Sequence, residues 1–241
     1  MTDSVYSRRL TVKSKDVDMF RRLRTSELFH LFQEASIAHT EELGMGRHMT
    51  LDRGLLWIVT HQRAEIARMP EYDETVTLRS WPGETMHLLF PRYYDVTGED
   101  GTVLVRSSAF WALIDEAERK MVVPAEHGIT VPAADEPPCL ELPGLPPVLP
   151  ERNRESFTAP FSYIDLNGHM NNARYFDLAE DRIGEAAEGK RLQSVSVSYG
   201  AEIRFRQEIT VTVGHEGDAW SVLGTAPEGK KPLFRMHFTY E

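Results

Sequence analysis

The sequence DLNGHMNNARYFD (165–177) decides how this chain is organised, because a weaker copy, DMFRRLRTSELFH (18–30), lies 147 residues earlier. Both copies begin with an aspartate and then turn into a run of helical spacing, in which Phe29 and Phe176 occupy the same position. Self-similarity at one offset over a whole element indicates a tandem repeat. We therefore expect two copies of one structural unit.

A second match extends the repeat beyond the helices. Ala-Glu-Ile occurs at 64–66 and again at 201–203, and each occurrence precedes a Thr-Val-Thr run that reads as a strand. The offset here is 137 residues, from Glu65 to Glu202. On this match Glu65 is the counterpart of Glu202 in the first copy.

Apolar periodicity and turn residues predict the same element order in both halves, namely a strand, a helix and then a run of antiparallel strands. In the first half Thr25 or Ser26 could cap the helix, Gly44 stops it, and GEDG (98–101) forms a hairpin turn. The predicted elements are strand 5–13, helix 25–44 and strands 55–67, 75–81, 88–96 and 102–115, then strand 157–163, helix 173–187 and strands 194–205, 208–213, 220–225 and 233–240.

A proline-rich segment separates the halves. Residues 132–150 contain seven of the 14 prolines, and such a stretch can neither continue a helix nor pair inside a sheet. We therefore expect a first repeat at 1–131, an extended linker at 132–152 and a second repeat at 153–241. Two helix-on-sheet units can pair their sheets edge to edge, which predicts an α+β pseudo-dimer with one continuous sheet around two helices.

Composition excludes several classes of protein. The 27 Lys and Arg residues against 37 Asp and Glu residues give a net charge of −10, which opposes binding to nucleic acid or to an anionic membrane. A single cysteine, Cys139, forbids an internal disulfide and a cysteine-rich metal site, and the histidines show no ligand spacing. No apolar run approaches the roughly 18 residues that span a bilayer. We expect a soluble cytoplasmic protein without metal or cofactor.

The loop before the second helix carries a set of polar side chains. Asp165, Asn167 and His169 alternate, so an extended loop would project all three to one side. The first copy has Phe20 and Arg22 at the last two of these positions, as expected if only one of two ancestral sites kept its function. The alternative is a purely structural turn that caps the helix.

These features together resemble the acyl-(acyl carrier protein) thioesterases of plants and bacteria. The resemblance rests on DLNGHMNNARYFD, on a glutamate about thirty residues later in SYGAEI (198–203), and on the degenerate first copy with its helix LFHLFQEASIAHTEELG (28–44). It implies a double hotdog fold, in which each long helix is wrapped by its sheet. It also implies hydrolysis of fatty acyl thioesters on acyl carrier protein (ACP).

The resemblance assigns the catalytic positions to Asp165, Asn167, His169 and Glu202. Plant members often carry a cysteine directly after the later acid, where this chain has Ile203. We therefore expect Glu202 to act as the general base for water, with His169 and Asn167 orienting the water or polarising the carbonyl. Asp165 would support the loop, or act as base or nucleophile itself. Backbone amides between residues 169 and 172 would stabilise the oxyanion.

A hotdog offers an apolar slot between helix and sheet for the acyl chain. In the first copy the candidates to line it are Leu28, Phe29, Phe32 and Trp57, although each could equally be ordinary core. The first copy would then hold the tail while the second cleaves.

An ACP partner is acidic, so it must dock on a local basic patch of this acidic chain. Arg204 and Arg206 lie nearest to Glu202 in the sequence and are the expected docking residues. The resemblance also leaves room for a homodimer of double-hotdog subunits. Three other readings stay open: an acyl-coenzyme A thioesterase of the same fold, a non-catalytic acyl-binding protein, and a hotdog dehydratase.

Overall fold

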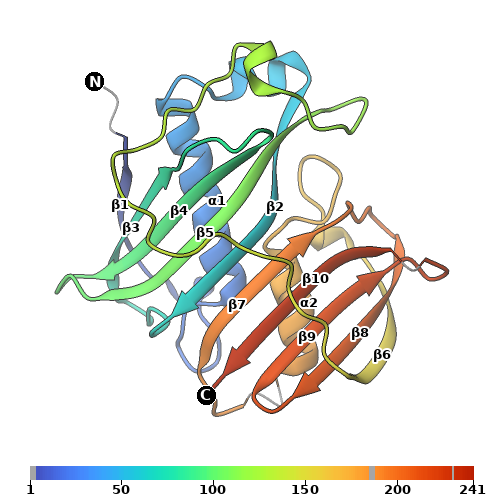
Figure 1. Cartoon of the computed structure of the whole chain (residues 1–241). Coiled ribbons are helices and arrows are strands. Elements are labelled where there is room, and N and C mark those ends of the chain that lie inside the picture. Colours follow the sequence, from blue (N-terminus) through green and yellow to red (C-terminus); the bar gives the residue numbers. More distant parts are fainter. Residues whose placement is uncertain (1–3, 185–187, 230) are drawn as a thin grey trace.

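In a computed structural model, which describes residues 4–184, 188–229 and 231–241, one antiparallel sheet of ten strands curves around two helices. Figure 1 shows both helices on one side of the sheet, one behind each half. The predicted α+β architecture with a continuous sheet is confirmed. Its helices are α1 (Thr25–Glu42) and α2 (Arg174–Ile183), and its strands are β1 (Tyr6–Thr11), β2 (Leu55–Ile66), β3 (Thr75–Pro82), β4 (Leu89–Gly98), β5 (Val103–Asp115), β6 (Glu151–Thr158), β7 (Leu192–Tyr199), β8 (Glu208–Glu216), β9 (Ala219–Thr225) and β10 (Pro232–Tyr240).

The strand order shows the internal symmetry. It reads β1-β3-β4-β5-β2 in the first half and, mirrored, β7-β10-β9-β8-β6 in the second. The halves join where β2 pairs antiparallel with β7, and Arg63 lies opposite Ser196 at the middle of this pairing. This edge-to-edge junction removes two free sheet edges, which would otherwise be open to pairing with other chains.

The two helices contact each other beneath the sheet. The rings of Phe29 in α1 and Phe176 in α2 lie 3.9 Å apart between centroids, and both side chains are buried. One hydrophobic cluster continues from the first half into the second, so the repeats share a single core. Each large apolar side chain buried there contributes roughly 1.5–3 kcal/mol relative to an exposed one. Among the described helices, none combines the length and apolarity that a membrane span requires.

The ends of the first helix differ in part from expectation. No side chain caps α1 at its start, and the hydroxyl of Thr25 donates instead to Glu180 on α2. The predicted cap is therefore wrong, because the helix begins at Thr25 with Arg24 as its N-cap residue, so that Thr25 and Ser26 both lie inside it. Gly44 ends the helix as predicted, at a φ of 75° that glycine adopts without steric cost.

Three elements of the second half have other boundaries than expected. The strand expected at 157–163 ends at Thr158 and begins already at Glu151, in an exposed, polar edge segment without hydrophobic alternation. The strand expected at 194–205 ends at Tyr199, where the amides of Gly200 and Ala201 both donate to the carbonyl of Leu233 and so break the regular ladder. The helix expected at 173–187 ends at Ile183, and residues 185–187 lie outside the described part.

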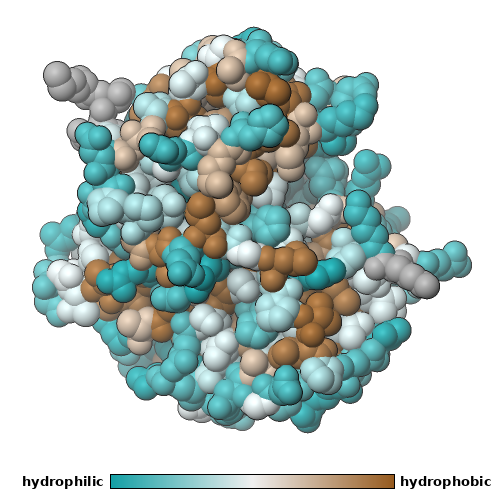
Figure 2. Space-filling view, in the orientation of Figure 1, coloured by the Kyte–Doolittle hydropathy of each residue, from teal (hydrophilic) through white to brown (hydrophobic). Residues whose placement is uncertain are grey.

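The proline-rich segment crosses the sheet on the face opposite the helices (Figure 1). Residues 129–150, all of them described, form no helix or strand, and the expected linker overlaps β6 at its last two residues. Its backbone is tied to the sheet, since Ser108 Oγ donates to the carbonyl of Glu141 and the Leu149 amide donates to Ser221 Oγ. In Figure 2 patches of hydrophobic side chains lie along this path, where Leu145 and Val148 are exposed.

Candidate active site

Two of the predicted catalytic side chains meet directly. His169 Nε2 lies 3.1 Å from Glu202 Oε2, although the residues come from the loop before α2 and the loop after β7. The His169 side chain is 12% exposed and that of Glu202 is 36% exposed. The imidazole is therefore largely buried, while the carboxylate remains accessible to water.

Asp165 and Asn167 form a tight turn rather than an extended loop. The Asp165 carbonyl accepts a hydrogen bond from the Gly168 amide at 3.0 Å, and the Asp165 amide donates to the carbonyl of His169 at 2.9 Å. The Asp165 carboxylate accepts from the Asn167 amide at 2.8 Å. The loop is not extended, so the condition under which all three side chains would project to one side is not met, because turn chemistry at Asp and Gly prevails here. Asn167 lies exposed at the tip of the turn.

The first copy contains the same turn, with Phe20 and Arg22 at the positions of Asn167 and His169. Asp18 Oδ1 accepts from the Phe20 amide at 2.8 Å, and Arg21, at a φ of 66°, holds the left-handed position that Gly168 holds at 79°. In both copies the aspartate carboxylate accepts a hydrogen bond from the amide two residues later, so the contact that the structure shows for it is the one that closes the turn. This contact favours the supporting role for Asp165 over a role as base or nucleophile.

The counterpart of Glu202 in the first copy is Met69 and not Glu65. In the second copy Met170 donates its amide to the carbonyl of Ile203, and in the first Leu23 donates to the carbonyl of Pro70. The bridges between His169 and Arg204 and between Arg22 and Glu71 fix the same register. The structural offset is thus 133 residues in this region, and the Ala-Glu-Ile match is four residues out of register. Glu65 lies within β2, where it pairs with Arg63.

The start of α2 presents backbone amides beside the site. Two of the four amides expected to bind an oxyanion are occupied: Met170 donates to Ile203 and Asn171 to the carbonyl of Tyr163. The side chain of Asn171 caps the entry to α2 by accepting from the Ala173 amide at 2.9 Å. Within the described part of the chain the His169 and Asn172 amides donate to no acceptor, which leaves these two as the candidate oxyanion donors of this loop.

A residue of the first copy reaches the same carboxylate. Arg119, in the loop after β5, places Nη1 3.1 Å from Glu202 Oε1. The sequence reasoning missed this contact, because no local pattern links residues 83 positions apart. Burial is the main cause that raises the pKa of the neighbouring Tyr175 well above its usual range, and the negative charge of Glu202 raises it further.

Arg204 and Arg206, the expected docking residues, lie exposed directly beyond Glu202. The Arg206 guanidinium lies 4.9 Å from the centroid of the Phe205 ring, and this ring packs edge-to-face against Phe161. Phe161 and Leu166 are 80% and 89% exposed. A basic and apolar surface therefore surrounds the rim of the site.

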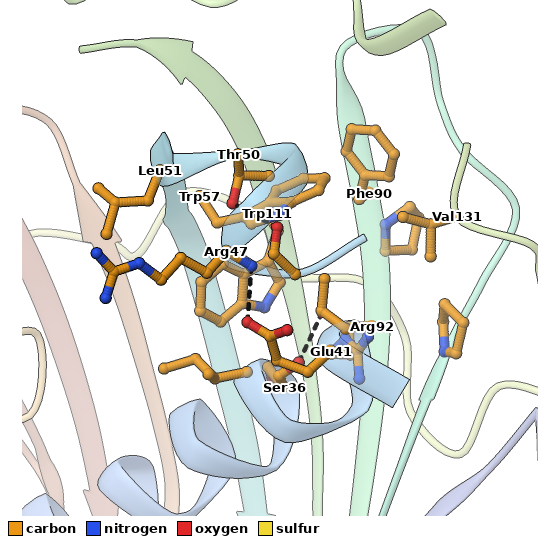
Figure 3. A pocket seen from close by; sticks show the side chains of 15 residues that line it. Ser36, Glu41, Arg47, Thr50, Leu51, Trp57, Phe90, Arg92, Trp111 and Val131 are labelled. Carbon is orange, nitrogen blue, oxygen red and sulfur yellow. Dashed lines mark hydrogen bonds between the residues drawn. The ribbon is translucent and has the colours of Figure 1, made fainter. Parts of the chain in front are cut away.

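The first copy contains a cavity of about 190 Å³ between α1 and the sheet. Of the four residues predicted to line an acyl slot, only Trp57 does so, whereas Leu28, Phe29 and Phe32 are buried in the core. Figure 3 shows Trp57 in the lining together with Phe90 and Trp111, which the sequence reasoning missed. Phe90 and Trp111 are cross-strand partners in β4 and β5, and these strands are buried along continuous runs, so hydrophobic alternation does not single the two residues out. The lining residues are Ser36, Ile37, Thr40, Glu41, Gly46, Arg47, Thr50, Leu51, Trp57, Pro82, Phe90, Pro91, Arg92, Trp111 and Val131.

Cys139 is half-buried in the linker and points at the sheet, where its thiol donates to the carbonyls of Tyr94 and Ser107. Burial raises the pKa of this thiol, which keeps it protonated and a poor nucleophile. Across the described residues no group of three His, Cys, Asp or Glu side chains gathers to hold a metal ion.

The architecture is similar to that of solved acyl-ACP thioesterase structures. An acyl-ACP thioesterase from Bacteroides thetaiotaomicron superposes with a TM-score of 0.89 at 23% identity, over 99% of this chain and 98% of its own. The 12:0-ACP thioesterase of Umbellularia californica gives a TM-score of 0.88 at 18% identity, over 100% and 95%. These likenesses confirm the double hotdog fold.

Sequence comparison gives the family. A chloroplastic acyl-ACP hydrolase of Cuphea viscosissima is 25% identical over 240 residues, which cover 93% of this chain and 56% of the relative. The chain spans about half the length of the curated relatives that it matches first. The family models of the acyl-ACP thioesterase N-terminal and C-terminal domains match residues 3–128 and 149–226, which is most of the chain. This protein therefore belongs to the acyl-ACP thioesterase family.

Proposed function

We propose that this chain hydrolyses the thioester of fatty acyl-ACP, which releases a free fatty acid and the carrier with its thiol, as a step of fatty acid biosynthesis. The observation that carries the proposal is the contact of 3.1 Å between His169 Nε2 and Glu202 Oε2, beside the start of α2, in a chain of this family. An imidazole paired with a solvent-facing carboxylate is an arrangement that can activate water.

In the proposed reaction Glu202 accepts a proton from water while the water oxygen attacks the thioester carbon. His169 holds the carboxylate in place and, with Asn167, orients the water or polarises the carbonyl. The carbonyl oxygen becomes an oxyanion, for which the His169 and Asn172 amides are the candidate donors of the loop. Collapse of this intermediate breaks the bond between carbon and sulfur, and the departing thiolate takes up the proton.

The acyl tail would lie in the first copy. All residues that line the cavity belong to that copy, from Ser36 to its last residue, Val131. The lining includes three aromatic rings, which offer apolar surface to a hydrocarbon chain, together with polar and charged side chains such as Glu41 and Arg47. Arg204 and Arg206, exposed beside Glu202, are the proposed contacts for the acidic carrier.

The test is to incubate the purified chain with acylated carrier protein and to detect free fatty acid by mass spectrometry, with Glu202→Gln as the control. Release by the wild type and its loss in the variant support the proposal. Acyl-coenzyme A in a parallel reaction identifies the substrate class, since faster turnover of that substrate would replace ACP as the assigned donor. Tight binding of acyl substrate without release of acid would overturn the hydrolase in favour of an acyl-binding protein.

A further inference from the structure

The carboxylate of Glu202 is held from two sides by residues of different repeats. Its Oε2 faces His169 Nε2 at 3.1 Å, and its Oε1 faces Arg119 Nη1 at the same distance. His169 belongs to the second copy and Arg119 to the loop after β5 of the first. With both oxygens engaged, rotation of the carboxylate is restricted to one orientation.

The loop that carries Arg119 is built to hold its position. The Asp115 carboxylate accepts from the amides of Ala117 and Glu118, and the Arg119 amide donates to the Asp115 carbonyl at 2.9 Å. Arg119 itself has a φ of 53°, a left-handed conformation that is uncommon outside glycine. Such a conformation persists only where its surroundings determine it.

The charges around this loop leave Arg119 available to Glu202. The neighbouring Lys120 pairs with Glu118 at 3.1 Å, so this local carboxylate has its own cation. Arg119 and Glu202 have side chains that are 34% and 36% exposed, and ion pairs of this exposure add little to folding stability. The main effect of the contact is therefore to fix the position of the Glu202 carboxylate and not to stabilise the fold.

We propose that Arg119 is a positioning residue of the site, supplied by the degenerate copy to the functional one. By holding Oε1 of Glu202 it directs Oε2 to His169 and to the water beside them. This inference rests on the proposed function, in which Glu202 and His169 act together. It gives the first copy a task in the chemical step in addition to holding the acyl tail.

Arg119→Gln tests the proposal, with Arg119→Lys as the conservative variant and Lys120→Gln as the matched control on the same loop. Loss of a positioned carboxylate should lower kcat about ten- to a hundredfold in Arg119→Gln, with KM changed by less than about twofold. Arg119→Lys should recover a large part of kcat, and Lys120→Gln should behave as wild type. An equal loss in Arg119→Gln and Lys120→Gln, or a change confined to KM, would overturn the proposal.

A double-mutant cycle with Glu202→Gln shows whether Arg119 acts through Glu202. In the Glu202→Gln background the further change Arg119→Gln should cost less than about twofold, because there is no carboxylate left to position. A loss of full size in that background would mean that Arg119 acts elsewhere.

A readout independent of turnover separates this inference from the proposed function. The imidazole nitrogen resonances of His169, assigned by their absence in His169→Ala, should move in Arg119→Gln and stay in place in Lys120→Gln. Unmoved resonances would overturn the positioning role even if the wild type is an active thioesterase. A wild type that releases no fatty acid would overturn the function, while the resonances would still report the contact.

Discussion

Met69 occupies in the first copy the position that Glu202 occupies in the second. The backbone around the two residues is the same, since the hydrogen bond of Leu23 to Pro70 repeats as that of Met170 to Ile203. The Met69 side chain is buried, whereas that of Glu202 is open to water and contacts His169. The same backbone therefore carries a polar site in the second copy and an apolar residue in the first. The first copy has no carboxylate at this position.

The first prediction concerns the paired residues. Glu202→Gln and His169→Ala should each lower kcat by about a hundredfold or more, as loss of a positioned base or its partner does. Glu65→Gln is the control, because Glu65 lies in β2 and pairs only with Arg63 among the described residues. Rates would be measured from release of fatty acid. Near-normal turnover in both site variants would contradict the proposed mechanism, in which Glu202 and His169 act together.

The thiol should be dispensable. Cys139→Ser is expected to keep essentially full activity, because the thiol faces the sheet from the linker and burial raises its pKa. Alkylation of the wild type, followed by the same assay, should leave turnover unchanged. Inhibition that the serine variant escapes would show that the thiol takes part in the reaction.

The cavity in the first copy should limit the length of the acyl chain. Ile37→Trp would fill it from α1, so turnover of long-chain acyl-ACP should fall about tenfold or more relative to short-chain substrates. Glu34→Trp, at another exposed position of the same helix outside the lining, is the control. A chain-length profile measured over several acyl-ACPs decides the question. Equal profiles in the two variants would place the acyl chain elsewhere.

Electrostatic docking should be visible in KM. Charge reversal at Arg204 or Arg206 is expected to raise KM for acyl-ACP severalfold, with little change for a short acyl-coenzyme A, and added salt should mimic it. Arg154→Glu, on the exposed edge strand β6, controls for the change of net charge. If both substrates respond alike, the arginines act on the shared site or on folding.

A half-buried acid between the helices should make stability depend on pH. Burial raises the pKa of Glu180 to about 7, above its ordinary value, and Thr25 donates to its carboxylate. The folded state then binds a proton more tightly than the unfolded state, so stability is highest below about pH 4.5 for this group and falls as the pH rises to about 7. Glu180→Gln should therefore be stabilising at pH 8, by as much as about 3 kcal/mol. Denaturant unfolding at pH 5 and pH 8 measures the difference, and equal effects at the two pH values would contradict it.

The sequence alone determined the features that depend on local spacing and turn chemistry. The repeat from Asp18 to Asp165, the two helices, the end of α1 at Gly44 and the double hotdog fold all follow from periodicity, glycine and one resembling motif. It also singled out His169 and Glu202, which the structure brings into contact. Where the local signal is weak, as in the polar edge strand β6, the predicted boundaries were wrong.

Only the tertiary structure decided which residues surround the reacting groups. The three-residue match Ala-Glu-Ile assigned Glu65, and not Met69, as the counterpart of Glu202. A match this short does not reveal insertions between strands, whereas the hydrogen-bond register does. The approach of Arg119 to Glu202 joins loops of different repeats, 83 residues apart, and exists only because β2 and β7 fuse two sheets into one. The cavity beneath Phe90 and Trp111 likewise depends on how side chains from several strands leave space against α1. Contacts of this kind are set by packing between distant segments, for which no single segment of the sequence carries a pattern.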